Sequence, residues 1–344
     1  MKLALVRFIP VDTAIPFIKM RVGAFGVSIL LMLASIGAFA TMGLNFGIDF
    51  RGGTLIEISV EEGTSLGQIR SNLAGVELGD VQVQEFGEET DVLIRVERVS
   101  IEEGVALQEW LRDSGYDAPR NLMTQPVDND DVAQQIVRAV VQAQLNSEFS
   151  NIEIRRVEVL GGQVSEELRV AGTTAVVVAL LLMLAYIWFR FEWQYSVGAV
   201  LALVHDVIAT IGFFAVTQLE FNLSTIAAIL TIVGYSMNDT VVVYDRIREK
   251  FRKYKSLPTN EVLNMAINKT LSRTILTSGT TLVAIIAMAV IGGPALEGFA
   301  LALIWGVVIG TYSSIFVAAP LLTLTGVKRE SGEDGSNAFI DNAP

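Results

Sequence analysis

The sequence has no cysteine and only one histidine, His205, among its 344 residues. Without cysteine, a disulfide framework, a thiolate metal site and a cysteine nucleophile are all excluded, and one histidine is too few for the usual protein-only zinc sites. Neither a GxxxxGK(S/T) phosphate loop nor a GxSxG nucleophile motif is present. We therefore expect no cofactor, no metal and no enzyme activity.

Lysine is absent from residues 45–169, where 24 Asp and Glu are accompanied by only 10 Arg. This acidic block suits a water-facing domain and would repel a phosphate backbone. No other part of the chain combines a basic face with stacking aromatic residues. These observations argue against nucleic acid as a partner.

Long apolar runs dominate the rest of the chain, and 51% of all residues are hydrophobic. Six runs are long enough to cross a hydrocarbon core of ~30 Å, so we predict an α-helical polytopic membrane protein. The six expected transmembrane helices are 22–44, 170–189, 196–216, 223–244, 274–292 and 298–324. The first run starts too late and is too long for a signal-peptide core, although "AFATMG" offers small residues, and we interpret it as an uncleaved helix.

Lysine and arginine are concentrated on one side of these spans. They occur in the leader 1–21, at Arg190, in the loop 245–273 and in the tail 325–344, whereas "TQLEFN" and "GGPALEG" on the other side have none. The positive-inside rule therefore places both ends in the cytoplasm and the block 45–169 outside. The loop 245–273 is amphipathic, and we expect a helix lying on the inner membrane surface against anionic lipid.

The acidic block 45–169 shows the alternation of a mixed α+β domain. Four strands are expected at 54–60, 81–87, 92–96 and 152–160, and two main helices at 65–75 and 130–146. This βαββαβ order is typical of a ferredoxin-like domain, with residues 100–130 as an insertion that carries one short helix. Ser165, followed by two glutamates, predicts the N-cap of the helix that leads into the second span.

Two ionisable residues lie where a charge is costly, Asp239 in the fourth span and Arg273 at the start of the fifth. One loop joins these spans, so both residues are expected at a similar depth. A pair that separates and re-forms would let Asp239 take up and release a proton, and a static structural ion pair is the alternative. Thr277, one turn beyond Arg273, is either a hydrogen-bond partner of this site or an ordinary interhelical contact.

Three further residues in the spans, Asn238, His205 and Asp206, are candidates for supporting roles. We interpret Asn238 as a hydrogen-bonding residue at a helix interface. His205 and Asp206 project about 100° apart on a helix, so we interpret them as structural, with a supporting role in the proton pathway as the alternative. Gly306 and Gly310 have the GxxxG spacing, which predicts close helix packing.

Three motifs resemble those of SecF subunits in the SecD/SecF family of the RND superfamily. They are "GIDFRGGT" (47–54), "TIVGYSMNDTVVVYDRIRE" (231–249) and "LSRTILTSGTTL" (271–282). Taken alone, "RGG" is typical of a glycine turn between the first span and the first strand, with ligand contact as the alternative. The residues that match the family's first motif are Gly47, Asp49, Arg51, Gly52 and Gly53.

The resemblance implies one half of an RND-type membrane unit in the bacterial inner membrane, with SecD as the other half and the domain 45–169 in the periplasm. The chain itself shows one set of six runs and no repeat, which agrees with a missing half. The family's proton-conducting Asp and Arg match Asp239 and Arg273, with H⁺ as the coupling ion, and a family Thr matches Thr277.

The resemblance also implies a function and partners. With SecD, the subunit would use the proton gradient to draw unfolded preproteins outward after SecA has driven them with ATP into the SecYEG channel. Membrane lipid is a further partner, and YajC and YidC are additional candidates. The alternative is a scaffold that holds SecD and the translocon together without conducting protons. A small-molecule antiporter is disfavoured, because RND drug pumps carry much larger outer domains.

Overall fold

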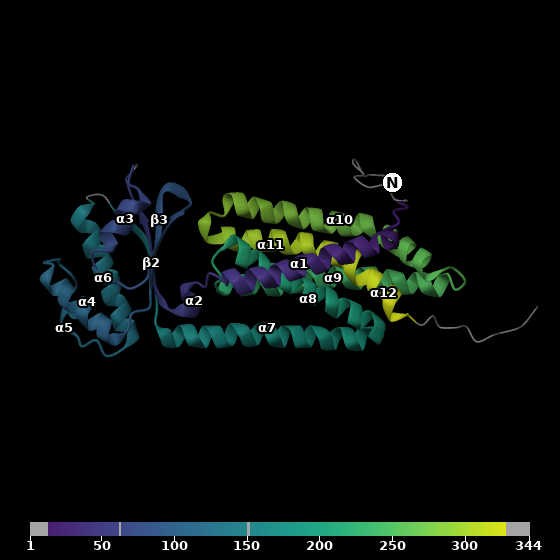
Figure 1. The fold of residues 1–344 in the computed structure, drawn as a ribbon, viewed down its shortest axis with the longest axis horizontal. Helices are drawn as coiled ribbons and strands as arrows, with labels where there is room; N and C mark the ends of the chain where they lie inside the picture. The colour runs from purple at the N-terminus through teal and green to yellow at the C-terminus, as the bar shows by residue number, and fades with distance from the viewer. Residues whose placement is uncertain (1–12, 62, 150–151, 328–344) are drawn as a thin grey trace, which may run out of the picture.

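The chain folds into a long helical bundle with a small sheet domain at one end (Figure 1). The computed structural model describes residues 13–61, 63–149 and 152–327. Residues 1–12 of the leader 1–21, with Lys2 and Arg7, and residues 328–344 of the tail 325–344, with Lys328 and Arg329, therefore lie outside the described residues, whereas Lys19 and Arg21 are described.

Six helices in the described residues are long and apolar enough to cross a membrane, which confirms a helical polytopic membrane protein. Helices α8, α9 and α11 form the buried middle of the bundle, whereas α1, α7 and α10 expose most of their surface. The bundle consists of η1 (Phe17–Met20) with α1 (Arg21–Met42), α7 (Gly162–Arg190), α8 (Trp193–Thr217), α9 (Leu223–Lys253), α10 (Thr259–Ile291), α11 (Pro294–Ser313), the π-helical turn η2 (Ser314–Ala318) and α12 (Ala319–Thr325).

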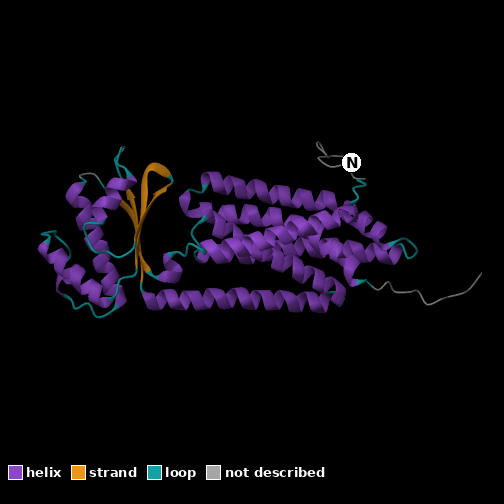
Figure 2. Ribbon diagram, in the orientation of Figure 1, coloured by secondary structure: helices purple, strands orange, loops and turns teal. Residues whose placement is uncertain are grey.

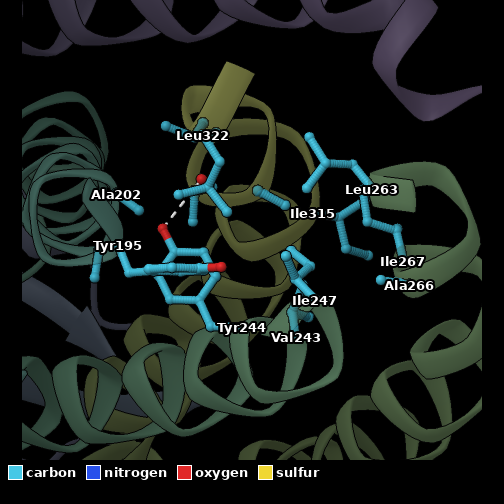
Figure 3. Packing of buried hydrophobic residues seen from close by; sticks show 14 of the residues in the cluster. Tyr195, Ala202, Val243, Tyr244, Ile247, Leu263, Ala266, Ile267, Ile315 and Leu322 are labelled. Carbon is cyan, nitrogen blue, oxygen red and sulfur yellow. Dashed lines mark hydrogen bonds between the residues drawn. The ribbon is translucent and has the colours of Figure 1, made fainter. Parts of the chain in front are cut away.

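The loop expected at 245–273 is largely helical, because α9 continues to Lys253 and α10 begins at Thr259. Leu263, Ala266 and Ile267 are buried in the same core as Ile247 (Figure 3). The expectation of a helix lying on the membrane surface was therefore wrong. Its apolar side chains are buried against α9. They are therefore removed from water without contact with lipid.

Figure 3 shows the core in which α8, α9, α10 and the segment η2–α12 meet. The rings of Tyr195 and Tyr244 lie 5.2 Å apart at 75°, an edge-to-face arrangement. The Tyr244 hydroxyl donates a hydrogen bond of 3.1 Å to the carbonyl oxygen of Ala318. Both tyrosines are almost fully buried, so this contact fixes η2 against α9.

The outer domain is a four-stranded antiparallel sheet in the order β2-β3-β1-β4. The strands lie within a few residues of the positions that the alternation predicted. All four helices of the domain cover one face of the sheet, and the bundle lies on the other side (Figure 2). The elements are β1 (Gly53–Ser59), α3 (Leu66–Leu73), β2 (Val81–Phe86), β3 (Glu88–Glu97), α4 (Ile101–Asp113), α5 (Arg120–Thr124), α6 (Asp130–Glu148) and β4 (Glu153–Leu160).

Polar side chains begin the helices of this domain. Ser100 accepts a hydrogen bond from the backbone N–H of Glu103, and the Glu103 carboxylate accepts one of 2.7 Å from the N–H of Ser100. The expected cap at Ser165 was wrong, because α7 begins earlier, after Gly161. Ser165 is buried in the first turns of α7 and donates to the carbonyl oxygen of Ile48 at 3.1 Å instead.

Candidate functional site

Asp239 lies inside the bundle on α9 and is only 8% exposed. Its Oδ1 accepts a hydrogen bond of 2.7 Å from the Thr274 hydroxyl of α10. Its Oδ2 has no hydrogen-bond partner in the part of the chain that the structure describes. A buried ionisable group usually has more hydrogen-bond partners than this one neutral donor. Sequence reasoning did not identify Thr274 as a partner of Asp239.

Arg273 does not form an ion pair with Asp239 in this structure. No salt bridge of Arg273 occurs within 4.0 Å among the described residues, and its side chain is exposed at the bundle surface. It nevertheless lies near enough to act electrostatically on Asp239, because it directly precedes Thr274. The Thr277 hydroxyl donates to the carbonyl oxygens of Arg273 and Thr274, both at 2.9 Å, and not to Asp239.

His205 and Asp206 lie on α8, and their side chains contact each other although adjacent helical positions project about 100° apart. The distance from His205 Nδ1 to Asp206 Oδ1 is 3.0 Å. Asp206 Oδ2 accepts hydrogen bonds from Ser236 of α9 at 2.5 Å and from Ser313 of α11 at 2.7 Å. The angle between adjacent helical positions does not prevent two flexible side chains from turning toward each other. Both residues are almost completely buried.

The π-helical turn η2 begins directly after Ser313. Ser314 lies 2.9 Å from the hydroxyl of Thr240, the residue that follows Asp239 on α9. π-helical turns often occur at functional sites, because they change the register of the side chains around them. The available signal in the sequence was the pair of serines in the apolar run "TYSSIF".

Close packing of α11 on α9 brings these groups together. A Cβ atom on Gly306 would overlap the side chain of Ile232, and one on Gly310 would lie 2.9 Å from Cβ of Ser236. The prediction of close packing from the GxxxG spacing is therefore confirmed. Asn238 is exposed on the outside of α9 and makes no hydrogen bond within the described residues.

The segment Gly47–Gly53 joins the bundle to the sheet. Gly52 and Gly53 have φ angles of +76° and +125°, and a Cβ atom on Gly53 would overlap the carbonyl oxygen of Val96. These observations agree with the glycine turn predicted for "RGG". Arg51 lies 4.0 Å from Glu97, and both side chains are about half exposed.

This junction also contacts the start of α9. The backbone N–H of Gly47 donates to the carbonyl oxygen of Phe221 at 2.9 Å. The Asp49 carboxylate accepts a hydrogen bond of 2.8 Å from the N–H of Leu223, the first residue of α9. An acidic group at this position suits the positive end of the helix dipole. The sequence motif therefore fixes the N-terminus of the helix that carries Asp239.

An ion pair links the sheet to the loop between α8 and α9. Arg95 of β3 lies 2.6 Å from Glu220 and donates to the side chain of Asn45 at 3.1 Å. Burial raises the pKa of Glu220, and the Arg95 guanidinium opposes this shift. This pair could not be predicted from local sequence pattern, because its members lie 125 positions apart in two different regions.

Two segments of the chain match known protein families. Residues 140–328 match the family described as "Protein export membrane protein SecD/SecF, C-terminal", and residues 37–64 match the "SecD/SecF GG Motif". The second match contains the junction Gly47–Gly53.

Curated relatives match over nearly the whole length. The chain is 39% identical over 343 residues to the protein translocase subunit SecF of Rhodobacter capsulatus, covering 98% of this chain and 96% of that protein. It is 41% identical over 319 residues to SecF of Rickettsia prowazekii, covering 92% and 93%.

Solved structures of SecDF are also similar. SecDF from Thermus thermophilus, described as a translocon-associated membrane protein, superposes with a TM-score of 0.74 at 33% identity, over 92% of this chain and 39% of that one. A SecDF structure in a super-membrane-facing form gives a TM-score of 0.61 at 33% identity, over 91% and 39%. The chain therefore spans about two fifths of these SecDF chains.

Proposed function

This chain belongs to the SecD/SecF family of protein-export membrane proteins and is a SecF-type subunit of the Sec protein translocase, and we propose that it couples proton movement through Asp239 to polypeptide export. The observation that carries this proposal is the environment of Asp239. It is a buried carboxyl group in a membrane span, with one hydroxyl donor and an open second oxygen among the described residues. An ionisable group at this depth is expensive to keep and marks proton relays in pumps and transporters.

Arg273 is the residue we expect to respond to the charge of Asp239. When Asp239 loses its proton, the carboxylate attracts the nearby guanidinium, and when it gains one this attraction is lost. Because Arg273 adjoins Thr274, each such movement would shift α10 against α9. The absence of an ion pair between Asp239 and Arg273 among the described contacts favours this cycle over a permanent lock, which the scaffold alternative requires.

A partner is expected to cover the polar face of α9 and α10. Hydroxyl, amide and guanidinium groups exposed to hydrocarbon are unfavourable, yet this face exposes Thr231, Asn238, Arg273, Thr277 and Thr280. The chain matches only 39% of each SecDF chain, and SecD is the natural source of the missing half. We propose that SecD packs on this face and completes an RND-type unit.

The outer domain 45–169 is proposed to be a ferredoxin-like domain in the periplasm. Its strand order β2-β3-β1-β4 with two long helices on one face supports the fold. The basic residues Arg190, Arg248, Arg252 and Lys253 gather at the opposite end of the bundle, which supports cytoplasmic ends in a bacterial inner membrane. SecYEG, SecA, YajC and YidC are proposed as partners, with unfolded preprotein as substrate and H⁺ as the coupling ion.

Substitution of Asp239 by Asn tests the proposal. Asn keeps an oxygen that accepts from Thr274 but cannot take up and release a proton. We predict at least about a tenfold loss of gradient-stimulated preprotein export in membrane vesicles, the size of a removed proton-transfer step, with normal insertion and co-purification with SecD.

Asp245→Asn is the matched control, because Asp245 lies on the same helix but pairs with Arg190 where both side chains are exposed. We expect it to export normally. Undiminished gradient-stimulated export by Asp239→Asn would contradict the proposal.

A further inference from the structure

Asp206 is a second buried carboxyl group to which the proposed function gives no role. It is 0% exposed, accepts hydrogen bonds from Ser236 and Ser313, and lies 3.0 Å from His205 Nδ1. Asn or Gln would meet the hydrogen-bonding needs of two serines without placing an ionisable group inside a membrane bundle. Packing and hydrogen bonding alone therefore do not explain why an ionisable group lies at this position.

The hydroxyl groups around Asp206 continue to Asp239. Ser313 and Ser314 are neighbours at the start of η2; Ser313 donates to Asp206, and Ser314 contacts Thr240, the residue that follows Asp239 on α9. Ser314 Oγ lies 2.9 Å from the Thr240 hydroxyl and 3.4 Å from the carbonyl oxygen of Ser236. Ser236, Thr240, Ser313 and Ser314 form the hydroxyl cluster. Ser236 and Ser313 donate to Asp206, whereas Thr240 and Ser314 contact each other next to Asp239 in the chain. The backbone oxygen of Ser236 and the adjacent positions of Ser313 and Ser314 join the two pairs.

His205 extends the hydroxyl cluster beyond Asp206 and has one ring nitrogen without a hydrogen-bond partner among the described residues. Its Nδ1 contacts Asp206, and its Nε2 has no hydrogen-bond partner among the described residues although the side chain is 1% exposed. The Tyr312 ring lies 6.1 Å from the imidazole, and its hydroxyl donates to the carbonyl oxygen of Ala24. No Lys or Arg in the described structure forms a salt bridge with Asp206. His205 is the titratable group in contact with Asp206, and Tyr312 is the titratable group that lies against His205.

We propose that Asp206, with His205, is a second proton-binding site that exchanges protons with Asp239 through the hydroxyl cluster. This inference rests on the proposed function, because it needs a proton to arrive at Asp239. In each transfer a serine or threonine hydroxyl accepts a proton and releases its own to the next oxygen. The hydroxyls are unchanged, Asp239 becomes ionised and Asp206 becomes neutral. His205 Nε2 then offers the next acceptor or donor, depending on its tautomer.

A purely structural role is the competing explanation, since Asp206 joins α8 to α9 and α11. The two explanations differ for Asp206→Asn, which keeps an acceptor for the serines but holds no exchangeable charge. In proteoliposomes that contain this chain with SecD, we expect Asp206→Asn to reduce gradient-driven proton flux at least tenfold, with assembly and melting temperature close to wild type. Thr210→Val is the matched control, because this buried hydroxyl on the same helix donates only to the backbone oxygen of Asp206.

The outcomes separate the two proposals. Wild-type flux in Asp206→Asn together with lost flux in Asp239→Asn would overturn the second site and leave the proposed function standing. Wild-type flux in both variants would overturn the proposed function.

A second measurement does not depend on the folding of Asp206→Asn. Infrared difference spectra between acidic and neutral buffer are recorded in a Glu220→Gln background, because Glu220 is a further buried carboxyl group with a raised pKa. They should show two bands of protonated buried carboxyl groups, and addition of Asp239→Asn should keep one of them. A single band in this background, lost when Asp239→Asn is added, would overturn the second site.

Discussion

Asp91 in the outer domain and Asp239 in the bundle are both buried carboxyl groups, at 5% and 8% exposure, but their partners differ in kind. Asp91 pairs with Arg155 at 2.5 Å, and the Arg155 side chain reaches solvent. Asp239 meets a neutral threonine hydroxyl. A carboxylate that is neutralised by a fixed cation serves structure, whereas one held by hydroxyls can change its charge without breaking an ion pair.

The same contrast holds for the two regions as a whole. The outer domain uses its charged and polar groups at helix caps and at ion pairs around an apolar core. The bundle places hydroxyls and carboxyl groups in its interior, where α8, α9, α10 and α11 meet. We therefore expect the polar groups of the outer domain to stabilise its fold and those of the bundle interior to exchange protons.

The largest effect on thermal stability is expected from Gly306→Ala, which separates α11 from α9. The added methyl group would overlap Ile232, and overpacking of this kind costs typically about 1–3 kcal/mol. We expect a clear loss of thermal stability of the chain in detergent, together with reduced export.

Gly234→Ala is the matched control for this variant. Gly234 also lies inside a bundle helix, α9, but a Cβ atom there has no neighbour within 4 Å. Alanine should leave the melting temperature unchanged or raise it slightly, because it favours the helix. Equal melting temperatures for the two variants would refute the close packing of α11 on α9.

A smaller effect on thermal stability is expected from Glu220→Gln, at the junction between the bundle and the sheet. Burial raises the pKa of Glu220 in the folded chain, so the folded state binds its proton more readily than the unfolded state. Its contribution to stability is then fully present below the ordinary glutamate pKa and is lost as the pH rises through the raised value. The melting temperature of the wild type relative to Glu220→Gln should therefore fall as the pH rises above the ordinary glutamate range near about pH 4 and through the raised pKa.

The exposed Glu102 of α4 supplies the control for this pH series, since Glu102→Gln changes a carboxylate that is not part of the Arg95–Glu220 pair. If the difference between wild type and Glu220→Gln instead grew with pH, the ion pair with Arg95 would outweigh burial, and the junction would be an ordinary salt bridge.

The smallest effect is expected from Ser100→Ala in the outer domain. It removes the cap of α4, which is worth about 1 kcal/mol, and should speed hydrogen exchange in the first turn of α4 about fivefold without altering export. The capping contacts lower the pKa of Glu103, so their contribution is present above the ordinary glutamate pKa and is lost as the pH falls. Exchange that stays unchanged at neutral pH would contradict the capping role.

Some of this arrangement follows from local sequence pattern and some does not. The spans and strands were predictable, because the periodicity of apolar residues depends on neighbours a few positions away. Asp239 was identifiable by the cost of burying a charge in a span. The contact of Asp206 with Ser313 depends on how α8 crosses α11, and no pattern within either helix determines that crossing.

Helix ends and side-chain directions were the least predictable features. Ser165 has the composition of a cap, but Gly161 takes that position because the chain leaves β4 directly into α7. Arg273 was expected to reach Asp239, yet it is exposed at the bundle surface. Its direction depends on what covers α10, and in this chain alone the polar face of α9 and α10 is uncovered.

Proton flux through proteoliposomes that contain this chain with SecD tests the central claim most directly, by comparing Asp239→Asn with Asp91→Asn. Both substitutions remove a buried carboxylate and keep an oxygen acceptor. The account predicts that Asp239→Asn loses gradient-driven flux at least about tenfold, whereas Asp91→Asn destabilises the outer domain and conducts like wild type once folded. Wild-type flux in Asp239→Asn would contradict it.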